Sequence, residues 1–402
     1  MKTYAIVKTH EIALKGKNRP WFMRRLADNL RRSTRGAGVE EVWQGQMMVG
    51  LTLAEDADWD VVKERIRDCF GVAKFFRANR LPRDLGQVKE ALPALLEPLE
   101  FESFRITANR ADKRFETRSD DINRDLGAFV KDHSGARVDL TNPDLEVFID
   151  VLPKEILVYF QEYKAMGGLP VGVSGPVAVM LSGGIDSPVA TWQMMKRGCQ
   201  AHLVHFHSYP LVDNSSMEKA AELAQFLTRF QYRSDLSLVP LAEIQKNIIV
   251  ATPPAYRIIL YRRFMVRITE ILGQRMGAKA IITGESCGQV SSQTLENIAV
   301  VDQISGVPIL RPLIGMNKEE IVDMARRLGT YPISIQPDQD CCSLFVPKHP
   351  VTRGDLKTVQ HLESLLPVEE LVQQALEQTQ VQRFRWPEPL GTADALGTAD
   401  VG

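Results

Sequence analysis

The sequence predicts an α/β fold with a parallel sheet for the second half of the chain. Short apolar runs alternate there with helical patterns, which is typical of strands joined by helical crossovers. The expected strands are residues 177–181, 201–207, 236–241 and 278–283. Ligands of such sheets bind at the carboxyl ends of the strands, so we expect a site where Ser182, His205, Phe206 and Gly284 lie.

The first expected strand ends in a turn suited to phosphate. Residues 177–187 read Val-Ala-Val-Met-Leu-Ser-Gly-Gly-Ile-Asp-Ser and lead into a helix, whose first N–H groups would attract an anion. Gly183 and Gly184 would permit positive φ and a close approach to the ligand, and Pro188 suits a first helical turn. No lysine follows the glycines, which excludes the loop of the mononucleotide-binding kinases and ATPases. An ordinary strand-to-helix turn is the alternative interpretation.

Two helices are expected after this turn. Residues 216–230 form an amphipathic pattern that begins with a serine cap. Residues 256–271 form an apolar helix that is interrupted by Arg257, Arg262, Arg263 and Arg267. Guanidinium groups on so apolar a helix need acceptors, and phosphates would serve.

Length and composition limit the class of protein. A chain of 402 residues with 44% hydrophobic content is long for one domain, and no apolar run approaches the ~20 residues of a membrane span. The N-terminus lacks the apolar core of a secretory signal, and the five cysteines, two of them adjacent, do not suggest a disulfide framework. We therefore expect a soluble, multidomain, cytoplasmic protein.

Basic residues gather in two segments although the net charge is −1. Residues 1–32 hold nine Lys or Arg against two acidic residues, and residues 105–124 form a second, more diluted basic stretch. Such patches neutralise backbone phosphates of nucleic acids, although a solvated helix face would have the same composition.

Five motifs resemble, in this order, those of the tRNA 4-thiouridine synthetase (tRNA sulfurtransferase, ThiI) family. They are Glu-Ile-Ala-Leu-Lys-Gly-Lys-Asn-Arg (11–19), Asn-Arg-Ala-Asp-Lys-Arg-Phe (109–115), Gly-Gly-Leu-Pro-Val-Gly (167–172), Ser-Gly-Gly-Ile-Asp-Ser (182–187) and Asp-Cys-Cys-Ser-Leu-Phe (340–345). The resemblance implies α/β and α+β domains: a ferredoxin-like domain (1–60), a tRNA-binding THUMP domain (61–165), a PP-loop ATP pyrophosphatase domain with a doubly wound parallel sheet (166–388) and a disordered tail (389–402).

Two positions depart from the family pattern. His10 stands where many members have glycine. Some members continue into a rhodanese-like domain, whereas Trp386 is followed here by Gly-Thr-Ala-Asp at 391–394 and again at 397–400. We therefore expect no rhodanese domain, and a separate cysteine desulfurase would supply the sulfur.

The resemblance implies three sets of site residues. ATP, with its Mg²⁺, would contact Met180, Leu181, Ser182, Gly183, Gly184, Asp186, Ser187, His205, Phe206, Arg262, Gly284 and Gln293. The tRNA would contact Lys15, Lys17, Asn18, Arg19, Arg110, Lys113 and Arg114. The catalytic residues would be Cys342, Asp186 and Lys318. Three of these residues also have a plainer structural interpretation: Asp186 as a helix cap, His205 as a buried strand histidine and Lys318 as a surface lysine.

Cys341 and Cys342 raise the question of the nucleophile. A persulfide is ionised near neutrality and would attack an activated carbon, and the family motif favours Cys342. Two buried apolar cysteines are the alternative, and the spacing does not fit structural zinc. Which cysteine resolves the persulfide stays open: a disulfide between the neighbours Cys341 and Cys342 is strained, and Cys287 is the alternative. A third alternative is that no cysteine resolves it and the second sulfur leaves as hydrogen sulfide.

The implied reaction is adenylation of uridine O4 at position 8 of tRNA, followed by attack of the persulfide to give 4-thiouridine. The family also passes sulfur to the sulfur-carrier protein ThiS for thiamine synthesis, and a homodimer would let one tRNA reach two subunits. The alternatives are another PP-loop adenylating enzyme, such as an amide-forming ligase or a 2-thiouridine synthase, and a non-catalytic RNA-binding protein.

Overall fold

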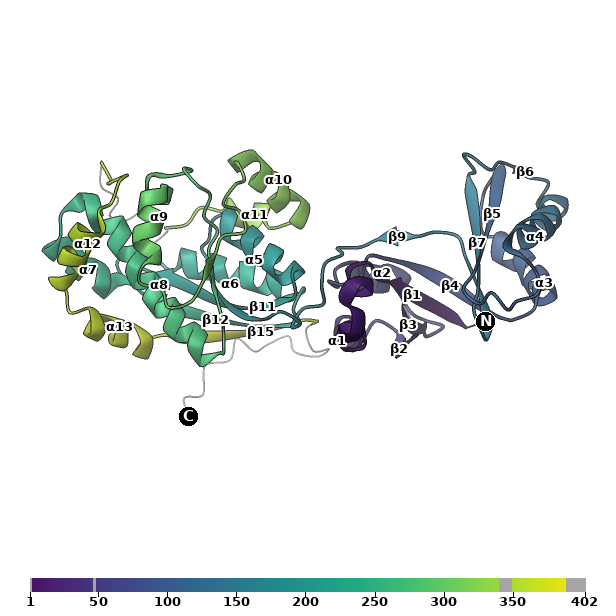
Figure 1. Ribbon diagram of the computed structural model, residues 1–402, viewed down its shortest axis with the longest axis horizontal. Helices are drawn as coiled ribbons and strands as arrows, with labels where there is room; N and C mark the ends of the chain where they lie inside the picture. Colours follow the sequence, from purple (N-terminus) through teal and green to yellow (C-terminus); the bar gives the residue numbers. More distant parts are fainter. Residues whose placement is uncertain (1, 46–47, 340–348, 388–402) are drawn as a thin grey trace. The chain divides into compact units, whose positions relative to one another are not determined.

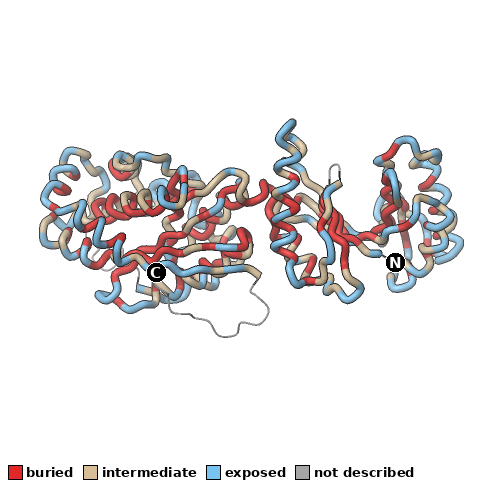
Figure 2. The backbone as a smooth tube through the Cα atoms, turned by 90° about the horizontal axis from the view of Figure 1, so that it is seen from below, coloured by how far each residue is buried: buried red, intermediate tan, exposed pale blue. Residues whose placement is uncertain are grey.

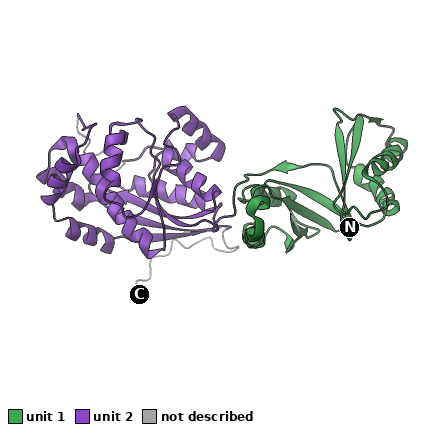
Figure 3. Cartoon of the chain, viewed as in Figure 1, with its two compact units in different colours: residues 1–168 green, residues 169–402 purple. Residues whose placement is uncertain are grey.

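The computed structural model describes residues 2–45, 48–339 and 349–387 (Figure 1). The chain forms two compact units, residues 1–168 and residues 169–402 (Figure 3). Over the described residues, no helix is both long and apolar enough to cross a membrane.

Unit 1 is built on one sheet with the strand order β2-β3-β1-β4-β8-β7-β5-β6, in which β9 also pairs with β4. The strands are β1 (Thr3–Lys8), β2 (Val39–Gln44), β3 (Met48–Leu53), β4 (Lys74–Pro82), β5 (Ser103–Arg110), β6 (Arg137–Val138), β7 (Leu145–Val151), β8 (Glu155–Tyr159) and β9 (Tyr163–Lys164). The helices are η1 (Glu11–Asn18), α1 (Arg19–Ser33), α2 (Trp59–Arg67), α3 (Leu85–Leu96) and α4 (Ser119–Ser134).

Strand β4 contributes to two cores in this unit. Phe75, near its start, packs in a cluster with residues of α1, α2, β1 and β3, and this cluster includes Val62 and Ile66. Leu81, near its end, packs in a second cluster with residues of α3, α4, β5 and β7. Residue 60, where the first domain is expected to end, lies inside α2, and α2 packs in the first cluster.

Unit 2 contains the predicted parallel sheet, with the strand order β14-β13-β10-β11-β12-β15. The strands are β10 (Gly175–Met180), β11 (Cys199–His207), β12 (Arg233–Pro240), β13 (Ile281–Ile282), β14 (Ile309–Leu310) and β15 (Gln380–Arg385). All neighbours pair in parallel except β12 and β15. The predicted fold class is confirmed, although the strand expected at 278–283 is reduced to β13.

Helices cover both faces of this sheet (Figure 1). One layer contains α5 (Asp186–Lys196), α6 (Ser215–Thr228), α10 (Lys318–Leu328) and α11 (Tyr331–Ser334), and the other contains α7 (Ala242–Ala251), α8 (Arg257–Arg275), α9 (Leu295–Asp302), α12 (Leu356–Ser364) and α13 (Val368–Glu377). Short 3-10 turns precede α8 and α9, at η2 (Pro254–Tyr256) and η3 (Ser291–Gln293). Figure 2 shows that buried residues run along the strands and along α8, whose Leu260, Phe264 and Ile268 are fully buried one turn apart.

Two local predictions about helices were wrong. Asn214, not a serine, is the N-cap of α6, and it makes no side-chain cap bond; instead Asp213 accepts from the backbone N and the hydroxyl of Ser215. The sequence suggests a phosphate as the acceptor for the arginines of α8. The acceptor of the buried Arg263 is instead Glu363, to whose two oxygens its guanidinium donates at 2.8 and 2.7 Å. Arg267 donates to the same carboxylate at 2.6 and 3.0 Å.

Candidate functional site

A cavity of roughly 550 Å³ opens at the carboxyl ends of β10, β11 and β13. Its position follows from the parallel sheet, because these strand ends share one edge. Ten of the residues predicted to bind nucleotide line it: Met180, Leu181, Ser182, Asp186, Ser187, His205, Phe206, Arg262, Gly284 and Gln293. The structure thus brings together residues from 180 to 293 that are distant in sequence.

Serine hydroxyls close the turn between β10 and α5. The backbone N of Ser182 donates to Ser187 Oγ at 2.9 Å, and the two hydroxyl oxygens lie 3.1 Å apart. The backbone N of Gly184 donates to Ser182 Oγ at 3.3 Å. Because Ser187 is buried, these bonds are shielded from water and stabilise the shape of the loop.

Gly183 and Gly184 differ in how much space surrounds them. Neither has a positive φ, so the predicted backbone conformation was wrong. At Gly183, an added Cβ would lie 2.6 Å from Asp338 Oδ2 and 3.1 Å from Lys219 Cδ, whereas at Gly184 it would only touch Ser182 Oγ at 3.4 Å. Space, rather than backbone angle, therefore favours glycine at position 183, since a larger residue would have to displace the side chains of Asp338 and Lys219.

Gly284, at the end of β13, approaches the start of α5. An added Cβ would lie 2.6 Å from the backbone N of Ser187 and 2.8 Å from the carbonyl carbon of Asp186. Backbone atoms cannot rotate away as a side chain can. Gly284 therefore closely approaches the backbone of the phosphate loop itself.

Two of the predicted catalytic residues form an ion pair. Lys318 Nζ lies 2.7 Å from Asp186 Oδ1, and Gln289 Nε2 donates to Asp186 Oδ2 at 2.9 Å. Lys318 is the first residue of α10, which begins with a capping box formed by Asn317 and Glu320. Asp186 does not cap α5, because Ile185 is the N-cap without a side-chain bond. Sequence reasoning missed Gln289, which carries no motif.

Arg262 reaches the cavity from α8 and is held by a buried carboxylate. Its Nη2 pairs with Glu285 Oε1, and Glu285 also accepts from Arg311 Nε and Thr283 Oγ1, each at 2.7 Å. Burial alone would raise the pKa of Glu285, but the charges of Arg262 and Arg311 hold it below its usual range. Sequence reasoning missed Glu285, although Thr-Gly-Glu directly follows an apolar strand.

His205 is a buried strand histidine that also lines the cavity. It is buried in β11, its Nδ1 lies 2.9 Å from the carbonyl O of Leu181, and it lines the cavity together with Phe206. The carbonyl requires a proton on Nδ1, so this bond sets the tautomer. His205 therefore ties the end of β11 to the end of β10.

The next inward residue of β11, His207, predicts a pH dependence of stability. Burial lowers its pKa from 6.5 to about 4. As the pH falls through 6.5, His207 becomes protonated in the unfolded chain but stays neutral in the folded chain. The contribution of His207 to the free energy of unfolding is therefore fully present above pH 6.5 and is lost as the pH falls towards 4. The variant His207→Gln should flatten this dependence in urea unfolding at pH 7 and pH 5; an unchanged slope would contradict the assignment.

The cysteines are only partly described. Cys341 and Cys342 lie outside the described residues, so the predicted nucleophile is not tested. Cys287 is an exposed free thiol in the loop after β13. The backbone N of Gly288 donates to the carbonyl O of Gln293 at 2.8 Å, and Ser286 N donates to Gln293 Oε1 at 3.4 Å. Cys287 therefore belongs to the loop that forms one wall of the cavity.

The residues predicted to bind tRNA lie in unit 1. Lys15, Lys17 and Asn18 belong to η1, and Arg19 begins α1. Lys17 and Asn18 are exposed, whereas Arg19 donates to the carbonyl O of Ala13 at 2.9 Å and supports the turn.

The second set of predicted tRNA contacts begins at Arg110, the last residue of β5. Arg110 donates to the carbonyl O of Phe115 at 3.0 Å, Lys113 is exposed, and the side chain of Arg114 is 85% exposed while it pairs with Asp112. Lys8, within the first basic segment, pairs with the start of β4, whereas Arg110 aligns through β7 and β8 with its end. The sheet therefore places Lys8 and Arg110 at the level of opposite ends of β4.

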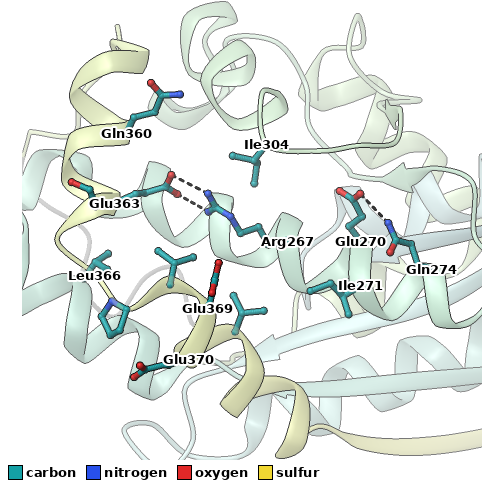
Figure 4. Close-up of a pocket in the computed structure, with 14 residues that line it drawn as sticks. Arg267, Glu270, Ile271, Gln274, Ile304, Gln360, Glu363, Leu366, Glu369 and Glu370 are labelled. Atoms are coloured by element: carbon teal, nitrogen blue, oxygen red, sulfur yellow. Dashed lines mark hydrogen bonds and ion pairs between the residues drawn. The ribbon is translucent and has the colours of Figure 1, made fainter.

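A second cavity, of roughly 800 Å³, lies between α8 and the segment joining α12 to α13 (Figure 4). Figure 4 shows Arg267 directed at Glu363, with Glu369 and Glu370 in the first turn of α13. None of the described residues that line this cavity belongs to the predicted nucleotide set. Its size alone therefore does not make it the candidate site.

The sequence matches three family models: the ThiI ferredoxin-like domain over residues 4–75, the THUMP domain over residues 82–161 and the thiamine biosynthesis protein ThiI over residues 172–368. A probable tRNA sulfurtransferase from Thermus thermophilus is 50% identical over 388 residues, which cover 96% of this chain and 95% of that protein. One from Moorella thermoacetica is 39% identical over 382 residues, with coverage of 95% and 97%. The crystal structure of a 4-thiouridine synthetase–RNA complex with bound ATP is 35% identical, has a TM-score of 0.88 and covers 95% of this chain and 100% of that chain.

Proposed function

Since this chain belongs to the tRNA sulfurtransferase family, we propose that it replaces O4 of uridine 8 in tRNA with sulfur, consuming ATP and forming 4-thiouridine. The observation that carries this proposal is the cavity at the carboxyl edge of the sheet, where ten residues predicted from the family's ATP set meet. A similar protein holds both RNA and ATP in its crystal structure.

The first half of the reaction activates the uridine. The loop from Ser182 to Ser187 would hold the phosphates of ATP, Phe206 would contact the adenine, and Arg262 would face the nucleotide from α8. Uridine O4 attacks the α-phosphorus and diphosphate leaves, so that the ring carries AMP as a leaving group. Lys318, which pairs with Asp186, would stabilise the negative charge that develops on the leaving diphosphate.

Magnesium fits this site as a companion of ATP. The described residues contain no group of three or more His, Cys, Asp or Glu that would hold a metal. A Mg²⁺ ion that brings its own phosphate ligands needs only one or two carboxylates, and Asp186 offers one. When bound, the ion neutralises phosphate charge.

The second half of the reaction transfers sulfur. A cysteine desulfurase would load Cys342 with a persulfide, whose terminal sulfur attacks C4 as AMP leaves. A second thiol then attacks Sγ of Cys342, which releases 4-thiouridine and leaves a disulfide that an external thiol reduces. Cys341, Cys287 or an external thiol would supply that second thiol.

Binding of tRNA is assigned to unit 1, through the ferredoxin-like and THUMP parts of the chain. The exposed Lys17, Asn18, Lys113 and Arg114 would contact backbone phosphates and so position the tRNA without reading its sequence. Transfer of sulfur to the carrier protein ThiS is a second candidate function, which the match of residues 172–368 to a thiamine biosynthesis protein favours.

The test is nucleoside mass spectrometry of unmodified tRNA incubated with the protein, Mg-ATP, cysteine and a cysteine desulfurase. We expect 4-thiouridine only when ATP is present. If AMP and diphosphate form without 4-thiouridine, the acceptor is another molecule, and ThiS is the next to test. If ATP is not cleaved, the proposal is wrong.

The variant Glu285→Gln should weaken ATP binding. It removes the charge that orients Arg262, and we expect the KM for ATP in diphosphate release to rise about tenfold, which corresponds to about 1.4 kcal/mol. The matched control is Glu243→Gln, which removes an exposed carboxylate paired with Lys246 on α7. An unchanged KM in Glu285→Gln would show that Arg262 needs no such support.

A further inference from the structure

Residues 334–339, which directly precede the segment with the adjacent cysteines, are tied to the phosphate loop and to α6. Ser334 Oγ donates to the carbonyl O of Gly184 at 3.3 Å. At the other end, the backbone N of Gln339 donates to Ser215 Oγ, in the first turn of α6, at 3.2 Å. One end of this short segment is therefore anchored to the phosphate loop and the other end to the start of α6.

Lys219 of α6 holds the middle of the same segment. Its Nζ donates to the carbonyl O of Gln336 at 2.6 Å and lies 3.2 Å from Asp338 Oδ1. Only 5% of the Lys219 side chain is exposed. A buried ammonium group is costly unless it is paired, so withdrawal of the segment would leave this charge without its described acceptors.

The same contacts bring the segment against the phosphate loop. The position that a Cβ would take at Gly183 is 2.6 Å from Asp338 Oδ2 and 3.1 Å from Lys219 Cδ. The loop, the helix and the segment thus meet at one point. Lys219 is not among the described residues that line the nucleotide cavity, which separates it from the proposed contacts to ATP.

We propose, on the basis of the function proposed above, that Lys219 is a positioning residue for the sulfur-transfer half of the reaction. It holds residues 336–338 against the phosphate loop. Cys342 follows Asp338 by four residues, and four residues of chain span at most about 14 Å. Because Asp338 lies against the phosphate loop, anchoring it limits how far the chain that carries Cys342 reaches from that loop.

The experiment separates the two half reactions in Lys219→Met. Diphosphate release is measured in a single turnover with tRNA and ATP but no sulfur donor, and 4-thiouridine formation is measured with cysteine and a desulfurase. We expect 4-thiouridine formation to fall about 30-fold and diphosphate release to stay within about twofold of wild type. Lys246→Met, the same change at an exposed lysine of α7, should alter neither rate.

Parallel loss of both rates in a folded Lys219→Met protein would make Lys219 a phosphate ligand and overturn the proposal, as would a wild-type rate of 4-thiouridine formation. If Lys219→Met does not fold, Asp338→Asn decides, because it weakens the same anchor from the partly exposed side. A selective fall of about fivefold in 4-thiouridine formation would support the proposal, and no fall would reject it. If wild type itself forms no 4-thiouridine, the proposed function fails instead.

Discussion

Replacing Cys342 with serine is expected to abolish 4-thiouridine formation, with a fall of at least about 10³-fold, because a serine hydroxyl cannot carry the transferable sulfur. The prediction rests on the motif Asp-Cys-Cys-Ser-Leu-Phe at 340–345, since Cys342 lies outside the described residues. Adenylation does not use this thiol, so diphosphate release with tRNA and ATP should persist. The two rates together test whether activation and sulfur transfer depend on different residues.

Cys341→Ser is the matched control for Cys342→Ser, because it makes the same chemical change one residue away. If Cys341 only resolves the persulfide, its variant should complete a first turnover when an external thiol is supplied. If Cys341→Ser is inactive in that single turnover and Cys342→Ser is active, the nucleophile has been assigned to the wrong cysteine.

Gly284→Ala is expected to lower diphosphate release and 4-thiouridine formation together, each by about 10²-fold. The added methyl group would meet the backbone N of Ser187 at 2.6 Å, and one of the two elements must move by several tenths of an ångström. That movement displaces Ser187 and Asp186, and a misplacement of this order costs about 10²-fold in rate. Overpacking should also destabilise the protein by about 1–3 kcal/mol.

Thermal unfolding measured beside both rates tests the Gly284 prediction. Gly315→Ala is the control, because an added Cβ at Gly315 meets nothing within 4 Å and its φ is not positive. It should retain wild-type rates and stability. A Gly284→Ala protein with wild-type diphosphate release would show that the start of α5 tolerates displacement.

The features that depend on local pattern were predicted well. Alternating apolar and helical segments predicted the parallel sheet, and the position of Ser182, His205 and Gly284 after their strands predicted that they would share one edge. Finer local details were wrong, such as the serine cap of α6 and the positive φ of Gly183. Several residues satisfy the same turn or cap, so a pattern does not select among them.

The sequence by itself therefore determined the fold class, the place of the phosphate loop and, through its motifs, the family. Only the tertiary structure decided which side chain meets which. Arg262 and Arg263 are adjacent in the sequence of α8. Arg263 pairs with Glu363, a hundred residues away, whereas Arg262 lines the cavity and pairs with Glu285. A side chain at position 183 would displace Asp338 and Lys219, which come from other elements. Burial forces each charged group to find a partner, but the identity of that partner depends on how helices and strands pack, which no local pattern contains.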